Sequence, residues 1–436
     1  MDAIILSVLV GILLVFFLLT GLPVSFTMGG LAVVGTVYVW GWKGLHMVAG
    51  TAFAEGTSYI LLAVPLFLLM ANILRYSGLA DDLYELIYKW FGWIPGGLAA
   101  GTVVICALFA AMAGISSVAT ITMGLIALPS MLKRGYDKFM VLGSISAGGA
   151  LGILIPPSII MIVYGSMAEA SIGQLFIGGL LPGLLLAVMF VIYVLVLCFI
   201  NPGMGPPVAE RFTLAEKVKT IKAVVLPGLL VALVLGVIYT GAATPTEAAG
   251  VGAAGAMGVS LIHRRLSFKD FKAALFSTFS LNAMVIWIVI GAVSFTHVLA
   301  YAGVSKLIHS IILDLGLSKW FLFFCMQMMY FILGCFLDPA GIIMLTTPIF
   351  VPLIKTLGFD PIWFGVIFTI NMEMAYITPP FGFNLFIMKA IVPKSITMGD
   401  IYRSILPFIL IQAACLILCT VFPQIIMYLP SNMVTK

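Results

Sequence analysis

The chain has 436 residues, of which 63% are hydrophobic and only 8% are charged, and its mean hydropathy is +1.23. Soluble domains carry about 25% charged residues, so the composition excludes a soluble enzyme and predicts an all-α polytopic membrane protein. The net charge of +5 gives no indication of a nucleic-acid partner, because the basic residues lie in the loops between apolar segments.

Apolar runs recur along the whole chain. Runs of about 20 residues, the length that crosses roughly 30 Å of hydrocarbon, predict spans near 3–20, 24–41, 57–76, 139–164, 174–200, 222–240, 246–262, 279–300, 362–388 and 403–428. The longer runs 97–132 and 319–356 are interpreted as re-entrant helical hairpins that enter and leave on the same side. The first run starts with Asp2 and lacks a cleavage site, so we expect a retained helix.

The orientation follows from the basic residues. With the two hairpins in place, all of the 21 Lys and Arg residues fall on one side except Lys43, Lys306, Lys319, Lys355 and Lys436. Lys and Arg accumulate in cytoplasmic loops. The sequence therefore predicts a multi-pass membrane protein with both termini outside the cytoplasm.

Two proline pairs interrupt predicted spans. Pro156–Pro157 lies within 139–164 and Pro379–Pro380 within 362–388, and the pairs are 223 residues apart. Proline has no N–H and clashes with the preceding turn, so each pair leaves unpaired carbonyl groups at membrane depth. Such groups are tolerated only inside protein or beside an aqueous cavity. A packing kink is the alternative, and it explains a duplicated pair less well than a single proline.

The same spacing extends beyond the prolines. The stretch "PSMLKRGYD" (129–137) recurs as "PLIKTLGFD" (352–360). We therefore predict two repeats, 1–205 and 222–430, joined by a cytoplasmic linker at 206–221. The first stretch and its flank carry three basic residues and the second only Lys355, which indicates opposite faces of the membrane. Inverted repeats with broken helices are typical of secondary transporters.

The tips of the two hairpins are the candidate binding elements. The first contains Gly114, Ser116 and Ser117, where small residues allow close approach, hydroxyls supply oxygen ligands, and the following helix start can face an anion. Small residues also occur in membrane helices for packing alone. The second tip contains Asp338 to Gly341, and an acid at membrane depth costs about 2.5–3.5 kcal/mol on insertion scales.

Other polar residues are weaker candidates. Asn371 and Glu373 precede the second proline pair, and Glu373 could instead pair with a lysine or a partner subunit. In "TPTEAAG" (244–250), Thr244 and Glu247 fit a capping box, which is a structural role. The segments 81–92 and 304–316 alternate charged and apolar residues and are interpreted as interfacial amphipathic helices that link fixed and moving parts.

The chain resembles the large membrane (DctM-like) subunit of the tripartite ATP-independent periplasmic (TRAP) transporters over essentially its whole length. The resemblance rests on several stretches, among them "GISSVAT", "GILIPPSIIMIVYG", "LDPAGIIMLTTPIFVPL" and "YITPPFGFNLF". It implies an elevator-type carrier that takes up an organic acid, such as a C4-dicarboxylate or sialic acid, with sodium as coupling ion and without another cofactor. It also implies two partners, a periplasmic substrate-binding protein and a separate small four-helix membrane subunit.

The resemblance also implies site residues. One sodium site would combine the first tip with the first break, and the other would combine the second tip with the second break, while the substrate would lie between the tips. The implied sodium-site residues are Gly114, Ser116, Ser117, Gly152, Pro156, Asp338, Gly341, Thr378 and Pro379. The implied substrate-site residues are Ser117, Ser158 and Asn384.

Other functions fit the sequence less well. A related elevator carrier that takes dicarboxylates without a binding protein would share the inverted hairpins. A membrane-embedded enzyme lacks catalytic material, because the chain has four histidines and no H-E-x-x-H motif. An ATP-driven pump lacks the Gly-Lys dipeptide from which a P-loop is built.

Overall fold

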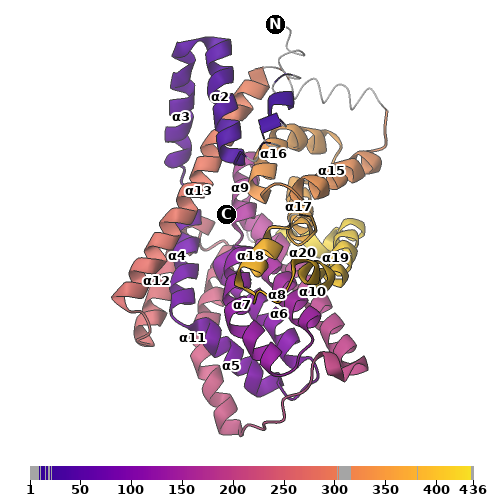
Figure 1. Cartoon of the computed structure of the whole chain (residues 1–436). Helices are drawn as coiled ribbons and strands as arrows, with labels where there is room; N and C mark the ends of the chain where they lie inside the picture. The colour runs from indigo at the N-terminus through magenta and orange to yellow at the C-terminus, as the bar shows by residue number, and fades with distance from the viewer. Residues whose placement is uncertain are drawn as a thin grey trace.

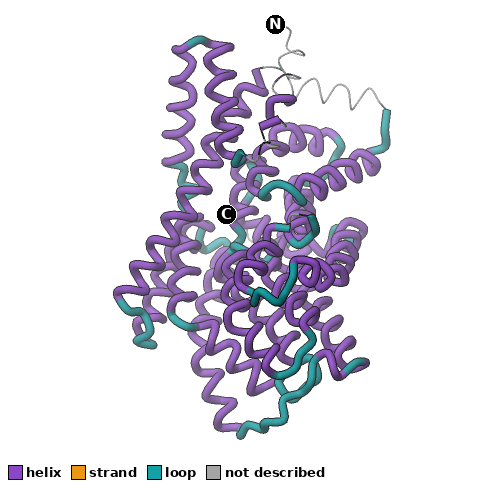
Figure 2. Tube along the Cα trace, viewed as in Figure 1, coloured by secondary structure: helices purple, strands orange, loops and turns teal. Residues whose placement is uncertain are grey.

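The computed structural model describes residues 9, 11–14, 16, 17, 20, 22–301, 303, 316–380 and 382–433. Throughout these residues the regular structure is helical, and they form no strand (Figure 2). A helix satisfies its backbone groups within its own segment, which is the condition for crossing hydrocarbon. The all-helical membrane fold expected from the composition is confirmed. The predicted helix at 3–20 and the amphipathic segment at 304–316 lie largely outside the described residues.

Several described helices can cross a membrane. Five are long and apolar enough, and there are seven if two bent pairs each count as one span. Large apolar side chains on these helices point outward, for example Phe276 and Leu410, which are 75% and 72% exposed. Such surface is unfavourable in water and suits contact with lipid.

One group of helices forms the left side of Figure 1. Within it, α2 packs against α13, and α12 packs against α4. The group combines helices from both predicted repeats. Its members are α2 (Val24–Trp40), α3 (Leu45–Gly56), α4 (Ala63–Tyr76), α11 (Leu214–Tyr239), α12 (Pro245–Ile262) and α13 (Phe268–Tyr301). We call this group the panel.

A second group holds the hairpins and the broken helices. The hairpins are α6–α7 (Gly97–Ala113 and Ser116–Lys133) and α15–α16 (Lys319–Gly334 and Pro339–Thr356). The broken helices are α8–α9 (Lys138–Ala150 and Ile159–Ala168, with a 3-10 turn at Leu151–Ile153) and α17–α18 (Pro361–Tyr376 and Phe383–Ile391). We call these four units the core group. Figure 1 shows them to the right of the panel.

The remaining helices connect or cover these groups. They are α5 (Leu79–Phe91), α10 (Ile172–Ile200), α19 (Met398–Val421) and α20 (Gln424–Ser431), with short 3-10 turns at Trp42–Gly44 and Pro202–Met204. Asp82 of α5 forms an ion pair with Arg265 in the loop after α12. Lys138 of α8 forms an ion pair with Asp400 of α19 at 2.7 Å. These exposed pairs lie at helix ends, where they join neighbouring elements.

The backbone repeats itself at the spacing seen in the sequence. Gly135 and Gly358 both adopt left-handed conformations, with φ of 78° and 76°. Two residues later, Asp137 and Asp360 cap the starts of α8 and α17, and each accepts hydrogen bonds from the two backbone N–H groups that lie two and three residues further on. Local capping chemistry is therefore the same in both halves of the chain.

Some helix boundaries differ from the predicted ones. The span predicted at 57–76 begins at Ala63, and a separate helix, α3, precedes it. In the second half α13 runs unbroken for 34 residues, well beyond the predicted 279–300. The span predicted at 403–428 ends at Val421, and α20 begins after Pro423. Proline cannot continue the helical hydrogen-bond pattern, which accounts for this last break.

The capping box predicted at Thr244 is confirmed. The Thr244 hydroxyl accepts from the Glu247 N–H, and the Glu247 carboxylate accepts from the Thr244 N–H at 2.8 Å. Pro245 occupies the first helical position, where its missing N–H costs nothing. Glu247 therefore has a structural role at the start of α12.

Candidate functional site

The first hairpin tip lies directly against the first break. Gly114 adopts a left-handed conformation with φ of 62°, and its carbonyl oxygen accepts a hydrogen bond from the Ile159 N–H at 3.4 Å. A β-carbon at Gly114 would lie 2.5 Å from the Pro157 carbonyl oxygen. The chain therefore requires glycine here both for conformation and for close approach of the two backbones.

Gly152, which belongs to the first break, lies close to the first hairpin tip. A β-carbon there would lie 3.0 Å from the Ser116 N and from the Ile115 carbonyl carbon. Gly152 and Pro156 are buried, as is Ser116, whereas Ser117 is half-buried. The structure thus brings Gly114, Ser116 and Gly152 close together across the first tip and break, whereas Ser117 and Pro156 are chain neighbours of residues that make these approaches.

Ser158 holds the end of the same break. Its hydroxyl donates to the Ile153 carbonyl oxygen and accepts from the Met161 N–H at 3.4 Å, which caps α9. The side chain is fully buried. Ser158, which was expected to bind substrate, therefore stabilises the break, because its hydroxyl donates and accepts hydrogen bonds within this segment.

The second tip is organised by Asp338. One carboxylate oxygen accepts from the Ala340 N–H at 3.0 Å and so caps α16, and the other accepts from the Tyr376 hydroxyl at 3.1 Å. Tyr376 is the last residue of α17, so the bond joins the second tip to the second break. Gly341 lies buried in the first turn of α16. Sequence reasoning missed Tyr376, although it stands next to the "ITPP" motif.

The second break is less deeply buried than the first. Thr378 is buried, and its hydroxyl donates to the Met374 carbonyl oxygen at 2.7 Å. Pro379 is half-buried and Pro380 is exposed, and the Pro380 carbonyl oxygen accepts from the Tyr402 hydroxyl at 2.6 Å. The two breaks therefore lie in unequal surroundings.

Asn384 connects the two halves of the chain. It lies at the start of α18, and its side-chain amide donates to the Ser116 hydroxyl at 2.6 Å and is 3.4 Å from the Ser146 carbonyl oxygen. The amide oxygen of Asn384 is buried and has no partner among the described residues. The arrangement is reciprocal, because α18 packs on α7 while α9 packs on α16. Each broken helix thus ends against the hairpin of the other half.

Replacing Asn384 with leucine should reduce uptake several-fold. Leucine has a similar size but cannot donate to Ser116, so it leaves a buried hydroxyl without its partner, at a cost of about 1–3 kcal/mol. Uptake of labelled substrate by membrane vesicles, corrected for the amount of folded protein, measures the effect. Gln412 to leucine would be a poor control because it is also buried and bonded, whereas exposed Asn432 to leucine should leave uptake unchanged.

Glu373 forms a hydrogen bond with a glutamine side chain. It is fully buried in α17, and its carboxyl oxygen accepts from the side-chain amide of Gln412 in α19 at 3.2 Å. The described ion pairs do not include it. Of the two alternatives offered for Glu373, a lysine partner is not found among the described residues, and a partner subunit stays a prediction.

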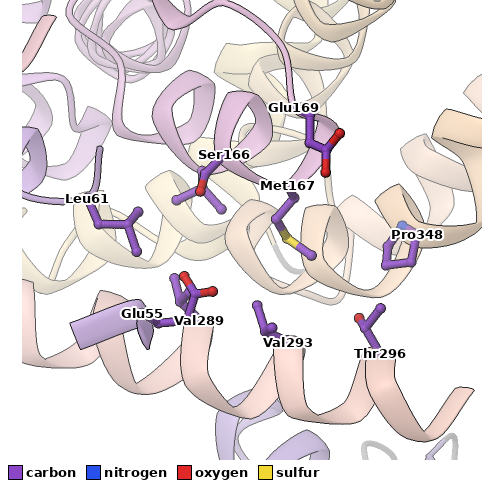
Figure 3. A pocket seen from close by; sticks show the side chains of 10 residues that line it. Glu55, Leu61, Ser166, Met167, Glu169, Val289, Val293, Thr296 and Pro348 are labelled. Carbon is purple, nitrogen blue, oxygen red and sulfur yellow. The ribbon is translucent and has the colours of Figure 1, made fainter. Parts of the chain in front are cut away.

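A cavity of about 380 Å³ separates the core group from the panel. Its walls come from the end of α3 and the turn that leads to α4, from α9, from α13 and from α16. Figure 3 shows the carboxylates of Glu55 and Glu169 at its rim, with Thr296 on the α13 wall and Pro348 on the α16 side. The cavity lies one to two helical turns from Ser158 and Gly341 along α9 and α16, so it borders the candidate site without containing its predicted residues.

Metal-binding side chains do not gather at this site. Within the described ranges, three or more His, Cys, Asp or Glu side chains never come together in a group that could hold a metal ion. The available ligands are instead hydroxyls, amides and backbone carbonyls at the two tips and breaks, together with the single carboxylate of Asp338. Half-helix ends of this kind are how membrane carriers bind ions and small anions.

Two hairpin tips that each meet a broken helix define the class of protein as a membrane transporter. A family model described as the DctM component of the tripartite ATP-independent periplasmic transporter matches residues 10–425. The chain belongs to this family, whose large permeases work with a periplasmic binding protein and a small membrane subunit.

Relatives agree with this assignment. The C4-dicarboxylate TRAP transporter large permease DctM of Pseudomonas aeruginosa is 35% identical over 92% of this chain and 93% of its own length. The isethionate TRAP permease DctMQ of Oleidesulfovibrio alaskensis is 32% identical over 94% of this chain and 64% of its own length. Other relatives are named for ectoine and for sialic acid.

A solved structure shares the fold. The crystal structure of the YdaH transporter of Alcanivorax borkumensis, described as having an unusual topology, aligns with a TM-score of 0.66 over 94% of this chain and 98% of its own. The sequence identity is 14%, so this likeness concerns the fold alone.

Proposed function

We propose that this protein carries a small organic acid across the bacterial inner membrane in symport with sodium. The observation that carries the proposal is the pairing of each hairpin tip with a helix break. In the first pair the Gly114 carbonyl oxygen accepts from the Ile159 N–H at the start of α9. In the second pair the Asp338 carboxylate at the start of α16 accepts from the Tyr376 hydroxyl at the end of α17. Carbonyl ends favour cations and N–H ends favour anions, so both charges of a sodium–anion pair are accommodated.

The two sodium sites would follow the two pairs. Gly114, Ser116, Ser117, Gly152 and Pro156 would form the first, and Asp338, Gly341, Thr378 and Pro379 the second. Hydroxyl and carbonyl oxygens are the ligands that hard cations prefer. The burial of the first group and the partial exposure of the second support unequal access of the two ions.

The substrate would bind between the tips. Ser117 is half-buried and Asn384 has a buried amide oxygen without a partner, so these two side chains are the proposed direct contacts, with Ser158 holding the break beside them. The relatives differ in the substrates for which they are named, and these substrates include C4-dicarboxylates and sialic acid. An organic acid with at least one carboxylate is therefore the proposed class.

The proposed movement is an elevator. The core group would slide along the panel, carrying both tips and both breaks as one unit. The cavity between the two groups, with walls from α3, the turn before α4 and α13 on one side and from α9 and α16 on the other, supports a separable boundary there. In this scheme 1–205 and 222–430 are the inverted repeats, 206–221 is their cytoplasmic linker, and both termini lie outside the cytoplasm.

The whole complex should be needed for transport. We expect that the purified chain in proteoliposomes accumulates no substrate, whereas addition of its small membrane subunit and its binding protein restores uptake under an inward sodium gradient. ATP should have no effect. The measurement is uptake of a labelled organic acid with sodium, potassium or ATP varied separately.

The outcomes separate the alternatives. Robust sodium-driven uptake by the chain alone would support a carrier that is independent of a binding protein and would contradict the proposal. Uptake that follows ATP without an ion gradient would contradict it as well. A binding protein with its ligand pocket mutated serves as the control for non-specific stimulation.

A further inference from the structure

A buried carboxyl group lies outside the site described above. Glu373 is fully buried, and the described part of the chain offers it one hydrogen-bond donor, the side-chain amide of Gln412. Its second carboxyl oxygen, Oε2, has no partner among the described residues, and neither has the amide oxygen of Gln412. The pair thus makes one hydrogen bond and leaves two acceptor atoms buried.

A second buried pair, between Asn371 of α17 and Gln327 of α15, shows what is unusual about Glu373 and Gln412. Two residues earlier, the Asn371 amide donates to the side-chain oxygen of Gln327 at 2.9 Å and to its backbone oxygen at 2.8 Å. The atoms left over are the Gln327 amide nitrogen and the Asn371 amide oxygen. These are a donor and an acceptor, so they complement each other. At Glu373 and Gln412 the leftover atoms are both acceptors if the carboxyl is ionised.

A single proton resolves this mismatch. A protonated carboxyl group is a donor at one oxygen and an acceptor at the other, and a primary amide offers the opposite pair. Glutamic acid and glutamine can therefore form two hydrogen bonds to each other, whereas a carboxylate and an amide can form only one. An isolated carboxylate in a low-dielectric interior would also be costly.

The lysine and arginine side chains on neighbouring helices do not pair with Glu373. The helices packed against α17 carry Lys138, Lys319, Lys355, Lys389 and Arg403. Lys138 is paired with Asp400, Lys389 donates to the Ile396 carbonyl oxygen, and the other three are exposed at helix ends. Of the titratable groups, the Cys415 thiol of α19 interacts electrostatically with Glu373, and Asp338 and Tyr376 are bonded to each other.

A sodium ion fits this location poorly. Hard cations require a shell of oxygen ligands. Here the unpartnered oxygens are one carboxyl oxygen of Glu373 and the amide oxygen of Gln412. A proton needs only the two oxygens that the structure supplies.

We propose that Glu373 and Gln412 form a proton-binding site in which a neutral Glu373 donates its carboxyl hydrogen to the Gln412 amide oxygen. The site joins α17, which leads to the second break, to α19. It leaves α17 without net charge inside the membrane. This proposal does not depend on the identity of the substrate or on sodium coupling.

Infrared spectroscopy of the purified full-length chain in lipid nanodiscs tests the proposal. At neutral pH, the wild type should show a carbonyl stretching band of a protonated, hydrogen-bonded carboxylic acid that is sensitive to deuterium exchange. Glu373→Gln should lose this band. The variant should fold, because two amides pair as Asn371 and Gln327 do. Asp338→Asn is the matched control for the other buried acid and should retain the band.

A second variant tests the partner. Gln412→Met removes the amide without large change in volume, so the acid band should remain and move to higher frequency as its hydrogen bond is lost. An unchanged acid region in Glu373→Gln would overturn the proposal. It would also be overturned if sodium at constant pH removed the band, because the site would then bind the metal ion.

Discussion

Replacing Gly114 with alanine should abolish uptake while leaving the protein folded. The left-handed backbone costs a residue with a β-carbon about 1–2 kcal/mol, and the added methyl group would lie 2.5 Å from the Pro157 carbonyl oxygen. Both effects push the first tip away from the first break, where the sodium ligands are proposed to meet. We expect at least a hundredfold loss, measured as initial uptake into proteoliposomes containing the complete complex.

Substitutions at two other glycines serve as comparisons for Gly114→Ala. Gly152→Ala meets the same tip from the opposite side, with backbone atoms about 3.0 Å from the new β-carbon, so it should also lose most uptake. Gly258 lies in α12 with no atom within 4 Å of an added β-carbon, and Gly258→Ala should behave as wild type. Gel filtration with the small subunit establishes that each variant assembles. Normal uptake by Gly114→Ala would refute the close tip–break contact as a requirement for transport.

Asp338→Asn should raise the sodium concentration needed for half-maximal uptake about five- to tenfold, which corresponds to about 1–1.4 kcal/mol. Asparagine keeps one oxygen, which can cap α16, and its NH2 group can donate to the Tyr376 hydroxyl oxygen in place of the second carboxylate oxygen. It lacks the charge. Because asparagine caps helices about as well as aspartate, expression and assembly should be preserved. The measurement is uptake against sodium concentration for wild type and variant under identical gradients.

Tyr376→Phe is the matched control for Asp338. It removes the hydroxyl that donates to Asp338 at 3.1 Å and leaves the charge in place, so its shift should be smaller. Asp338→Ala should lower stability by about 1 kcal/mol through loss of the cap. If the sodium curves of wild type and Asp338→Asn coincide, Asp338 is a helix cap and does not support the ion.

Local features were predictable because their causes are local. The breaks at the proline pairs follow from chemistry within one helical turn, and so do the caps at Asp137 and Asp360 and the capping box at Thr244. The repetition of "PSMLKRGYD" as "PLIKTLGFD" predicted two similar backbones, and the left-handed Gly135 and Gly358 reproduce that similarity. The proposed repeat boundaries rest on the same pattern.

Helix continuity was not predictable in the panel. Residues 57–62 and the positions 223 further on are both largely apolar, yet the chain leaves the helix between α3 and α4 and stays helical in α13. Apolar composition favours burial or lipid contact in either case. Packing against different neighbours, α12 for α4 and α2 for α13, distinguishes the two halves.

The sequence by itself determined the membrane class, the two hairpins, the two breaks and the family, because hydropathy, proline chemistry and motif spacing act along the chain. Only the tertiary structure decided which polar side chains meet. Asn384 reaches Ser116 across 268 positions, Tyr376 reaches Asp338, and Gln412 reaches Glu373. These pairs depend on helices from distant segments packing side by side, and a buried polar group must take whichever partner that packing brings within hydrogen-bond distance.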